Sequence, residues 1–421
     1  MAVRGSSAEG EEDGIIEVLD MEEYFSGDTA RVAKFCEHLR EICHKVGFFY
    51  VKNHRVPQDL CDSFLQLGRE FFDMPFKEKM RLDYRNSPQF RGYMKIGEEL
   101  TGGMKDFREQ LDLGPEEAED VDIVDGKEQR LVYPLYRRLR GPNQWPSDHD
   151  LPDFKAKAEE LMEKMGALSM HIMQAIALSL GLRKDYFDST FQPSPHYQMR
   201  VLRYPPKPQT EDAEKVGMFG VGEHTDSGYL VLLLQDLVGG LQAQTSGGKW
   251  TDIPPKKGTL VVNLGEMLQL ATGGYYLATL HRVQSQTGSR SRYSLPFFFN
   301  PKLEADIRAL NMVANTVYIS ITAQSDDSPL PSSLQEKESS RKRPRKCDEE
   351  NKMIPIFGQN AFKVFARSHP ESLQEHHADL LQFDGKLTDI LSTLEKTAPK
   401  SSSQYDFESR NGKWQQCNVI R

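Results

Sequence analysis

The sequence predicts an α+β protein in which a helical region comes first and a β-sandwich or jelly roll follows. Before about residue 190, apolar residues recur at three- and four-residue steps, as they do in amphipathic helices. After about residue 195 the pattern changes to short β-rich runs separated by turn residues, which is typical of a sandwich or a barrel. Helices and strands are therefore segregated along the chain rather than alternating.

The first region contains two short strand candidates and three helices. In chain order we expect a strand at 15–19, a helix at 32–46, a strand at 48–51, a helix at 60–72 and a helix at 153–181. Gly47 ends the first helix, because glycine readily adopts the left-handed conformation found at helix ends. Asp153 is the expected N-cap of the last helix, since its carboxylate can accept hydrogen bonds from free backbone N–H groups.

The second region contains six strand candidates. They lie at 197–204, 229–234, 249–253, 259–264, 277–284 and 291–299. Glycine pairs, such as Gly239-Gly240 and Gly273-Gly274, separate several of them and indicate turns.

The composition excludes several classes of protein. No run of about 18 apolar residues occurs, and the N-terminus has no apolar segment of the secretory type, so we expect no membrane partner. The net charge of −9 argues against a nucleic-acid-binding protein. The 5 cysteines form no CxxC pair, which favours free thiols and the cytoplasm.

Polar segments divide the chain further. We expect a flexible leader at 1–13, a mainly helical region at 14–190, a β core at 191–323, a disordered insertion at 324–352, a helical region at 353–396 and a flexible tail at 397–421. The insertion holds a basic cluster from Arg341 to Lys346, which would permit nuclear import; a solvated charge run is the alternative.

Two histidines and an aspartate form a candidate metal site. His224 and Asp226 lie at the entry to the apolar run 229–234, and His281 lies in a later β pattern. Residues i and i+2 of an extended segment point to the same face, so His224 and Asp226 can converge on one ion. Two histidines and one carboxylate form a facial triad, which leaves positions of a non-haem iron open for O2 and an organic co-substrate.

A His-x-Asp pair alone is a weak signal, because a lone buried histidine is usually a core residue with satisfied hydrogen bonds. His377 and Asp379 form a second such pair. That pair lies in a helical pattern, where i and i+2 diverge, and no further histidine follows it in the sequence. We therefore interpret it as structural.

A carboxylate-binding pair follows the triad. On an extended strand, Arg292 and Ser294 share one face while Tyr293 and Leu295 take the other. A guanidinium binds a carboxylate in a fork geometry that lysine cannot match, and a hydroxyl adds a neutral donor. This combination suits 2-oxoglutarate, whose keto acid end chelates iron and whose distal carboxylate needs an anchor.

Arg290 and Arg282 are rival anchors for that carboxylate. Arg282 should face away from the metal, because it follows His281 directly on the same strand.

Several segments of the chain match one family in order. They are 47–54 (GFFYVKNH), 91–93 (RGY), 141–146 (GPNQWP), 203–206 (RYPP), 224–226 (HTD), 258–265 (GTLVVNLG), 280–283 (LHRV) and 292–301 (RYSLPFFFNP). Together they resemble the isopenicillin N synthase-like branch of the Fe(II)/2-oxoglutarate-dependent dioxygenases. The resemblance covers about residues 14–301, with a weaker match over 354–380.

The resemblance implies a double-stranded β-helix (jelly roll) core with a helical N-terminal region packed against it. It implies iron at His224, Asp226 and His281, and the 2-oxoglutarate carboxylate at Arg292 and Ser294. Tyr204 matches a tyrosine that contacts co-substrate or substrate in members of the family. The chain departs from the family's pattern at Arg55, where a glycine is usual, and in the insertion.

The expected function is that of a monomeric dioxygenase that uses Fe(II), 2-oxoglutarate and O2. It would oxidise a small-molecule metabolite, by hydroxylation, with release of succinate and CO2. Alternatives are an oxidase of the same fold that uses O2 without 2-oxoglutarate, and a catalytically silent binding protein. Candidate lining residues of the substrate site are Phe90, Tyr93, Met94, Phe107, Arg108 and Phe297 to Phe299, although all could equally be core or lid residues.

Overall fold

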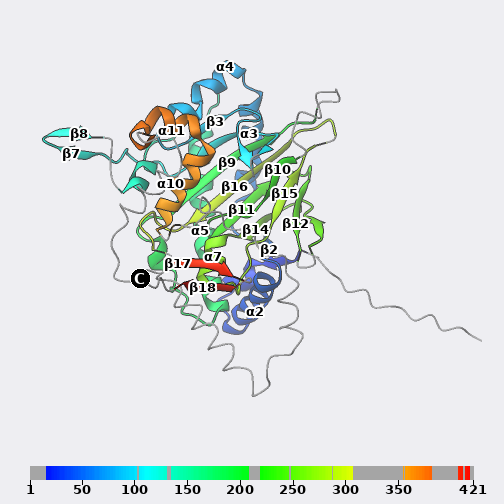
Figure 1. The fold of residues 1–421 in the computed structure, drawn as a ribbon. Coiled ribbons are helices and arrows are strands. Elements are labelled where there is room, and N and C mark those ends of the chain that lie inside the picture. Colours follow the sequence, from blue (N-terminus) through cyan, green and yellow to red (C-terminus); the bar gives the residue numbers. More distant parts are fainter. Residues whose placement is uncertain are drawn as a thin grey trace, which may run out of the picture.

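The structure is a computed structural model that describes residues 16–101, 104–129, 134–207, 219–245, 248–286, 288–306, 354 and 356–381, together with the two strands at 406–410 and 413–417. It combines helices with two main β-sheets (Figure 1). The α+β class is therefore confirmed. The leader, the insertion and its basic cluster lie outside the described residues.

The N-terminal part follows the predicted order closely. Its elements are β1 (Val18–Asp20), α1 (Met21–Phe25), α2 (Thr29–Lys45), β2 (Phe48–Lys52), α3 (Gln58–Asp73) and α4 (Phe76–Lys79). Gly47 has a φ of +68° and separates α2 from β2, as expected of a glycine that ends a helix.

Short strands and one long helix complete the region before residue 190. They are β3 (Gly92–Met94), β4 (Leu100–Thr101), β5 (Met104–Lys105), β6 (Glu109–Leu113), β7 (Asp122–Val124), β8 (Lys127–Gln129), α5 (Phe154–Ser179) and α6 (Asp188–Phe191), with short 3-10 helices at Met80–Leu82, Tyr84–Asn86 and Leu135–Leu139. Asp153 is the N-cap residue of α5, as predicted, but it has a left-handed conformation and its side chain does not make the expected capping hydrogen bond.

The larger sheet has eight strands in the order β1-β2-β14-β11-β16-β9-β6-β3. Its central strands are β14 (Thr259–Leu264), β11 (Leu230–Gln235), β16 (Arg292–Asn300) and β9 (His196–Tyr204). The N-terminal region supplies both edges, β1 and β2 on one side and β6 and β3 on the other. The sheet therefore joins segments that lie far apart in the sequence.

The smaller sheet has the order β10-β15-β12-β13. Its strands are β10 (Phe219–His224), β15 (His281–Gln284), β12 (Leu241–Gln244) and β13 (Trp250–Asp252). Strands β10 and β12 were not predicted from the sequence, because the run 219–224 is rich in glycine and the run 241–244 is short and half polar.

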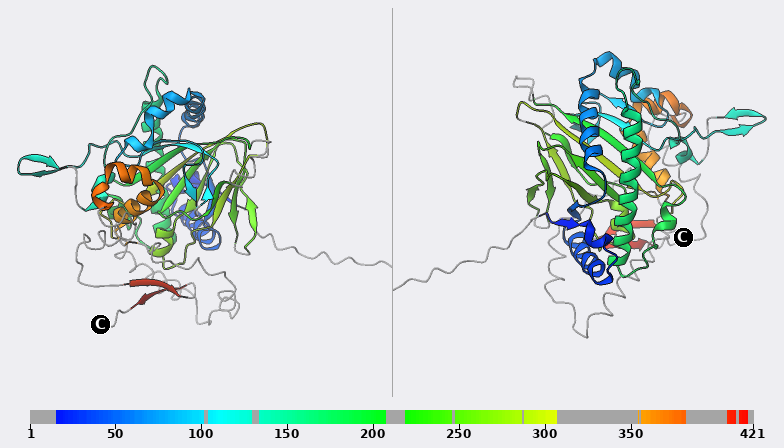
Figure 2. Two further views of the ribbon diagram at one scale, coloured as in Figure 1. Left: turned by 45° about the horizontal axis from the view of Figure 1, so that its top comes forward. Right: turned by 180° about the vertical axis from the view of Figure 1, so that it is seen from behind.

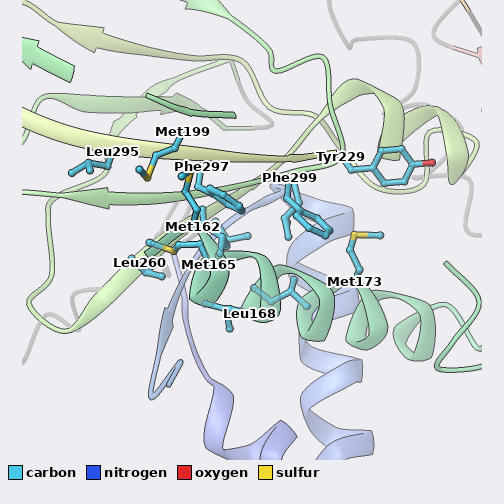
Figure 3. Close-up of a cluster of buried hydrophobic side chains, with 14 of the residues drawn as sticks. Met162, Met165, Leu168, Met173, Met199, Tyr229, Leu260, Leu295, Phe297 and Phe299 are labelled. Atoms are coloured by element: carbon cyan, nitrogen blue, oxygen red, sulfur yellow. The ribbon is translucent and has the colours of Figure 1, made fainter. Parts of the chain in front are cut away.

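Two apolar cores lie on opposite faces of the larger sheet. Helices α2, α3 and α5 cover the outer face (Figure 2). Met162, Met165 and Leu168 of α5 pack there against Leu295, Phe297 and Phe299 of β16, among other side chains (Figure 3).

The smaller core lies between the two sheets, on the inner face. The larger sheet gives it Phe48, Tyr50, Leu202, Tyr204 and Val261, and the smaller sheet gives it Val221, Leu241, Ala243 and Val283. Because side chains alternate along a strand, β9 and β14 each send apolar residues to both cores. Side chains on the inner face consequently lie between the sheets.

The C-terminal elements pack beside Phe90. They are α10 (Phe357–Ser368), α11 (Pro370–His376) and a 3-10 helix at Ala378–Leu381. Phe90 contacts Phe362 and stacks on Phe365. All three lie within 353–396, where the sequence analysis expects a helical region. Within the tail, β17 (Asp406–Arg410) and β18 (Lys413–Cys417) pair with each other as a hairpin that was not predicted.

Candidate metal centre and anion site

His224, Asp226 and His281 meet between the two sheets. His224 is the last residue of β10, and His281, the first residue of β15, is its cross-strand partner. Asp226 lies in the loop that leads from β10 to β11. Its Oδ1 is 3.8 Å from His224 Nε2 and its Oδ2 is 3.6 Å from His281 Nε2. Three ligand atoms of these residues lie within 4.8 Å of one another, as around one metal ion.

Backbone carbonyls orient both imidazole rings. His224 Nδ1 lies 2.8 Å from the Gly222 carbonyl oxygen, and His281 Nδ1 lies 3.0 Å from that of Thr279. A carbonyl oxygen only accepts, so in each ring Nδ1 carries the proton and donates it. The Nε2 lone pair of each ring then faces the other members of the cluster, which is the tautomer that a metal ligand needs.

Burial lowers the pKa of His224 to about 4, and the neighbouring His281 contributes to that lowering. His224 is therefore neutral at pH 7, so its Nε2 keeps a lone pair for a metal. The side chain still has 31% of its surface exposed, whereas His281 has 10%. The cluster is thus open to solvent on the His224 side.

Asp226 is held by residues that the sequence analysis did not single out. Asn263 of β14 donates a hydrogen bond from Nδ2 to Asp226 Oδ2 at 2.7 Å. The Asp226 carbonyl accepts from the Glu266 N–H at 2.7 Å. Gly265 permits this close approach, because a Cβ there would lie 2.2 Å from the Gly228 carbonyl oxygen. The only sequence signal for Asn263 is its position as a polar residue inside an apolar strand pattern.

Arg292 and Ser294 lie on the inner face of β16, as the alternation of side chains along a strand predicts. Tyr293 and Leu295 point into the outer core instead. Arg292 is fully buried, and its Nη1 donates to Ser294 Oγ while its Nη2 donates to Gln235 Oε1, both at 2.9 Å. Among the described residues, no carboxylate pairs with Arg292, and its Nε has no hydrogen-bond partner.

Tyr204 lies beside Arg292. The two residues are cross-strand partners, and the guanidinium is 4.9 Å from the centre of the Tyr204 ring. Gly220 of β10 leaves room for that ring, since a Cβ there would lie 2.6 Å from it. The tyrosine ring thus lies against the Arg292 guanidinium.

The rival arginines lie elsewhere. Arg282 points away from the metal side, as expected: its Nε donates to Gln242, its Nη1 pairs with Glu223 at 3.0 Å, and it covers the Trp250 ring. Arg290 is exposed.

The second His-x-Asp pair is structural. Asp379 forms an ion pair with Arg138 at 2.8 Å, and His377 Nε2 bonds to the Pro88 carbonyl at 2.8 Å. Neither side chain belongs to a metal-ligand cluster among the described residues.

Most of the proposed lining residues belong to the core. Tyr93, Phe297 and Phe299 pack on the outer side of the larger sheet, and Phe90 packs against α10. Phe298 alternates to the inner face. Arg108 is buried and forms an ion pair with Asp106 at 3.2 Å, so it is not an unpaired cation waiting for a carboxylate.

A cavity of about 480 Å³ lies on the outer face, between α5 and the end of β16. Its lining includes Met162, Tyr197 and Phe299. Because the sheet separates it from the His/Asp/His cluster, it is not the site of that cluster's chemistry.

Two family models match the chain. Residues 16–148 match the N-terminal region described as "non-haem dioxygenase in morphine synthesis", and residues 195–301 match the 2OG-Fe(II) oxygenase superfamily. A 2-oxoglutarate-dependent dioxygenase from Dothideomycetidae sp. is 37% identical over 285 residues, which are 66% of this chain and 72% of the relative. The chain belongs to the 2OG-Fe(II) oxygenase superfamily.

Other members of the superfamily show its range. A 1-aminocyclopropane-1-carboxylate oxidase from Dictyostelium mucoroides is 33% identical over 66% of this chain and 79% of its own length. The crystal structure of a full-length Neurospora crassa protein in complex with alpha-KG aligns with a TM-score of 0.60 at 27% identity, over 70% of this chain and 88% of that chain.

As a 2OG-Fe(II) oxygenase, the protein is a 2-oxoglutarate-dependent dioxygenase whose cofactors are Fe(II), 2-oxoglutarate and O2. The class of enzyme and the cofactors expected from the sequence are thereby confirmed. No helix in the described part of the chain is both long and apolar enough to cross a membrane.

Proposed function

We propose that His224, Asp226 and His281 hold the Fe(II) ion, and that Arg292 and Ser294 bind the distal carboxylate of 2-oxoglutarate. The observation that carries this assignment is the complete burial of Arg292 without a carboxylate partner in the described structure. A buried, unpaired charge is strongly destabilising, so such a site favours an anionic ligand. The two neutral acceptors that Arg292 does have, Ser294 and Gln235, orient the guanidinium without neutralising it.

The donor set fits Fe(II). Two neutral imidazoles and one carboxylate are the ligands of non-haem iron oxygenases and leave adjacent coordination positions free. Asn263 and the Gly222 and Thr279 carbonyls hold these ligands in the required orientation. When bound, Fe(II) together with 2-oxoglutarate and O2 supplies oxidation of a substrate C–H bond, with release of succinate and CO2.

The protein's own contribution is binding, orientation and the exclusion of water. Arg292 and Ser294 fix one end of the co-substrate, and the Tyr204 ring closes one side of it. The apolar residues between the sheets, such as Leu202 and Val283, keep the space between the clamp and the metal ligands dry. Fixing both ends of the co-substrate directs the oxidation to a second small molecule, and we propose hydroxylation as the outcome.

The resemblance and the topology also support a finer description of the fold. We propose that the two facing sheets form a double-stranded β-helix, with β10, β15 and β12 as its minor sheet. In this proposal the N-terminal region at 14–190 supports the core that the sequence analysis expects at 191–323, of which residues 208–218 and 307–323 lie outside the described residues. We further propose that the protein is a monomer. We also propose a reducing compartment such as the cytoplasm, because Cys36, Cys43 and Cys61 are free and buried.

A second candidate function is an oxidase that uses O2 without 2-oxoglutarate. The similarity to a 1-aminocyclopropane-1-carboxylate oxidase motivates it. The buried Arg292 disfavours it, because that site would then lack the anion that the guanidinium requires.

Titration of 2-oxoglutarate into the anaerobic Fe(II) protein tests these assignments. Chelation of Fe(II) by the keto acid should produce a visible charge-transfer band, and admission of O2 should then yield succinate. His224→Ala should abolish iron binding, the band and turnover. A protein that binds Fe(II) and consumes O2 without the band would instead be the oxidase, and an active His224→Ala variant would remove His224 from the ligand set.

A further inference from the structure

A buried polar cluster lies on the inner face of the larger sheet, beyond the anion site. We call it the inner polar cluster, and its members are Glu99, Gln110, Asp112, Gln198 and Arg200. Asp112 of β6 and Arg200 of β9 are cross-strand partners, and Gln110 is the partner of Leu202, which belongs to the core between the sheets. Gln198, Arg200 and Tyr204 share one face of β9. The cluster therefore lies on the same face as the Arg292 site.

The inner polar cluster approaches the proposed metal ligands through the segment before β6. Asp106 accepts a hydrogen bond from the N–H of Gly222, two residues before His224. Arg108, which pairs with Asp106, acts electrostatically on His224 as well as on Glu99 and Asp112. Arg108 thus lies close enough to both His224 and the carboxylates of the cluster to interact electrostatically with each of them.

Negative charge exceeds positive charge in this region. Asp106 and Arg108 neutralise each other at 3.2 Å. Glu99 and Asp112 then share the single guanidinium of Arg200, at 3.9 Å and 3.4 Å, and neither distance is that of a good hydrogen-bonded ion pair.

Burial opposes ionisation of both carboxylates, but the nearby Arg200 and Arg108 hold the pKa of Glu99 below its usual value, so the cost of burial falls on Asp112. Glu99 is 7% exposed and Asp112 is 1% exposed. Burial raises the pKa of Asp112 to about 6, which Arg200 only partly opposes. His369 of the C-terminal region adds no compensating charge, because burial lowers its pKa to about 4 and it is neutral at pH 7.

Several polar atoms of the cluster lack hydrogen-bond partners in the protein. Gln110 is 1% exposed, and its Nε2 donates to both Glu99 and Asp112, while its Oε1 has no donor. Asp112 Oδ1 and Arg200 Nε face each other at 3.4 Å but form no hydrogen bond with each other or with another group of the described residues. Buried polar atoms in native proteins are almost always satisfied by protein, water or ligand, so these atoms point to a ligand or to the waters that it displaces.

The cluster is also reachable from solvent. The Arg200 side chain keeps 14% of its surface exposed, and Gln198 and Phe298 are half-buried. Phe298 lies under Arg200, with 5.7 Å between the guanidinium carbon and the ring centre. His224, at the metal cluster, is open as well.

We propose that the carboxylates of Glu99 and Asp112 bind a cationic nitrogen group of the primary substrate, an amine or a guanidinium. The enzyme is then selective for positively charged small molecules. Gln110 Oε1 and Asp112 Oδ1 accept the N–H groups of that cation, and the bound charge offsets the excess of carboxylates. The proposal rests on the function proposed above, because it assigns the substrate of the same site.

The test is a set of small molecules matched in length and different only in end-group charge. n-Hexylamine and n-pentylguanidine carry a cationic end group, hexanamide an uncharged one and hexanoate an anionic one, and none of these compounds has a second charged group. Succinate formation by the full-length Fe(II) protein is measured with each compound at saturating 2-oxoglutarate. Cationic members should stimulate it and their uncharged and anionic counterparts should not.

Two isosteric variants, Glu99→Gln and Asp112→Asn, test whether the inner polar cluster causes the preference for cations. Each should raise the KM of the stimulating cation by at least about tenfold, because a hydrogen bond to a charged group is lost. For the co-substrate 2-oxoglutarate, the KM should stay unchanged. Glu37→Gln, the same change at an exposed position of α2, is the matched control and should behave as the unmodified protein.

Three results would overturn the proposal: stimulation only by uncharged or anionic members, stimulation by no member of the set, or an unchanged KM of the stimulating cation in both cluster variants. The anaerobic charge-transfer band with 2-oxoglutarate separates this failure from failure of the proposed function. A protein that shows the band but no preference for cations retains the proposed function and loses only this substrate assignment. The same band in the variants shows that they are folded.

Discussion

Arg292 combines a permanent charge with complete burial, and this combination makes it the most informative residue of the site. Its neighbours Ser294 and Gln235 each accept one hydrogen bond but supply no negative charge. A guanidinium in this setting is stabilised by an anion with two oxygens that match its fork. Lysine would keep the charge and lose the geometry.

We therefore expect Arg292→Lys to weaken the binding of 2-oxoglutarate by roughly 10-fold or more, since about 1.5–3 kcal/mol is typical of a charge-assisted hydrogen bond. Anaerobic titration of the Fe(II) protein, followed at the charge-transfer band, measures this. Iron affinity should not change. Arg290→Lys, at the exposed neighbouring position, is the control; equal affinities in the two variants would contradict the role of Arg292.

Asn263 supports the proposed metal site through its hydrogen bond to Asp226. Its hydrogen bond to Asp226 Oδ2 fixes the carboxylate that lies between the two histidines. Loss of such a supporting contact typically weakens metal binding by about 10- to 100-fold. We expect that loss for Asn263→Ala in an Fe(II) titration, with little change for Asn86→Ala at the protein surface. Unchanged iron affinity in Asn263→Ala would show that Asp226 does not need this partner.

At the scale of elements, α5 shows how one helix supports the site from the opposite face of the sheet. Leu168 and Met165 pack on the outer side of β16, the strand whose inner side carries Arg292 (Figure 3). The register of this packing therefore fixes which face of β16 is turned inward. Leu168→Ala should destabilise the protein by about 2–5 kcal/mol in urea unfolding, because it leaves a cavity in this core.

At Gly166 of the same helix, by contrast, we expect a substitution to increase the stability of the protein. A Cβ at this position would lie 4.0 Å from the Phe297 ring, which is ordinary contact. Glycine in a helix interior costs about 1 kcal/mol relative to alanine. We expect Gly166→Ala to raise the free energy of unfolding by about 0.5–1 kcal/mol in the same urea experiment. A lower stability would mean that α5 is packed more tightly here than the distance indicates.

At the scale of the whole molecule, several histidines are buried as neutral groups. Burial lowers the pKa of His196 to about 3, and those of His369 and His377 to about 4. In the unfolded chain a histidine pKa is about 6.5. Below that pH the unfolded state binds more protons than the folded state, so stability falls as the pH falls from about 6.5 to about 4. Well above pH 6.5 these groups are neutral in both states and no longer change the stability.

His369→Asn should therefore flatten this pH dependence. One histidine whose pKa moves from about 6.5 to about 4 accounts for up to about 3 kcal/mol of acid destabilisation. Urea unfolding at a series of pH values between about 4 and about 8 gives the slope. His149→Asn is the control, because that side chain is 95% exposed. An unchanged slope in His369→Asn would mean that His369 takes up its proton at the same pH in the folded and the unfolded protein.

The larger sheet joins strands of the N-terminal region to strands of the core, and the sequence pattern alone did not predict this pairing. The run 48–51 was predicted as a buried strand, but nothing local shows that it pairs with β14, more than 200 residues later. Strand β10 was not predicted, because its stability also depends on a distant partner. Its sequence, FGVGEH, has little β propensity, and its pairing with β15 stabilises it instead.

The sequence by itself determined which residue types are present for the chemistry and which side chains of a strand share a face. The His-x-Asp pair, the later histidine and the alternation around Arg292 follow from residue types and from the two-residue repeat of a strand. The tertiary structure decided which polar residues surround them. Asn263 reaches Asp226 from β14, and Glu99 meets Arg200 from a distant segment, because pairing between remote strands brings them onto one face. A repeat along one strand carries no information about which strand lies beside it.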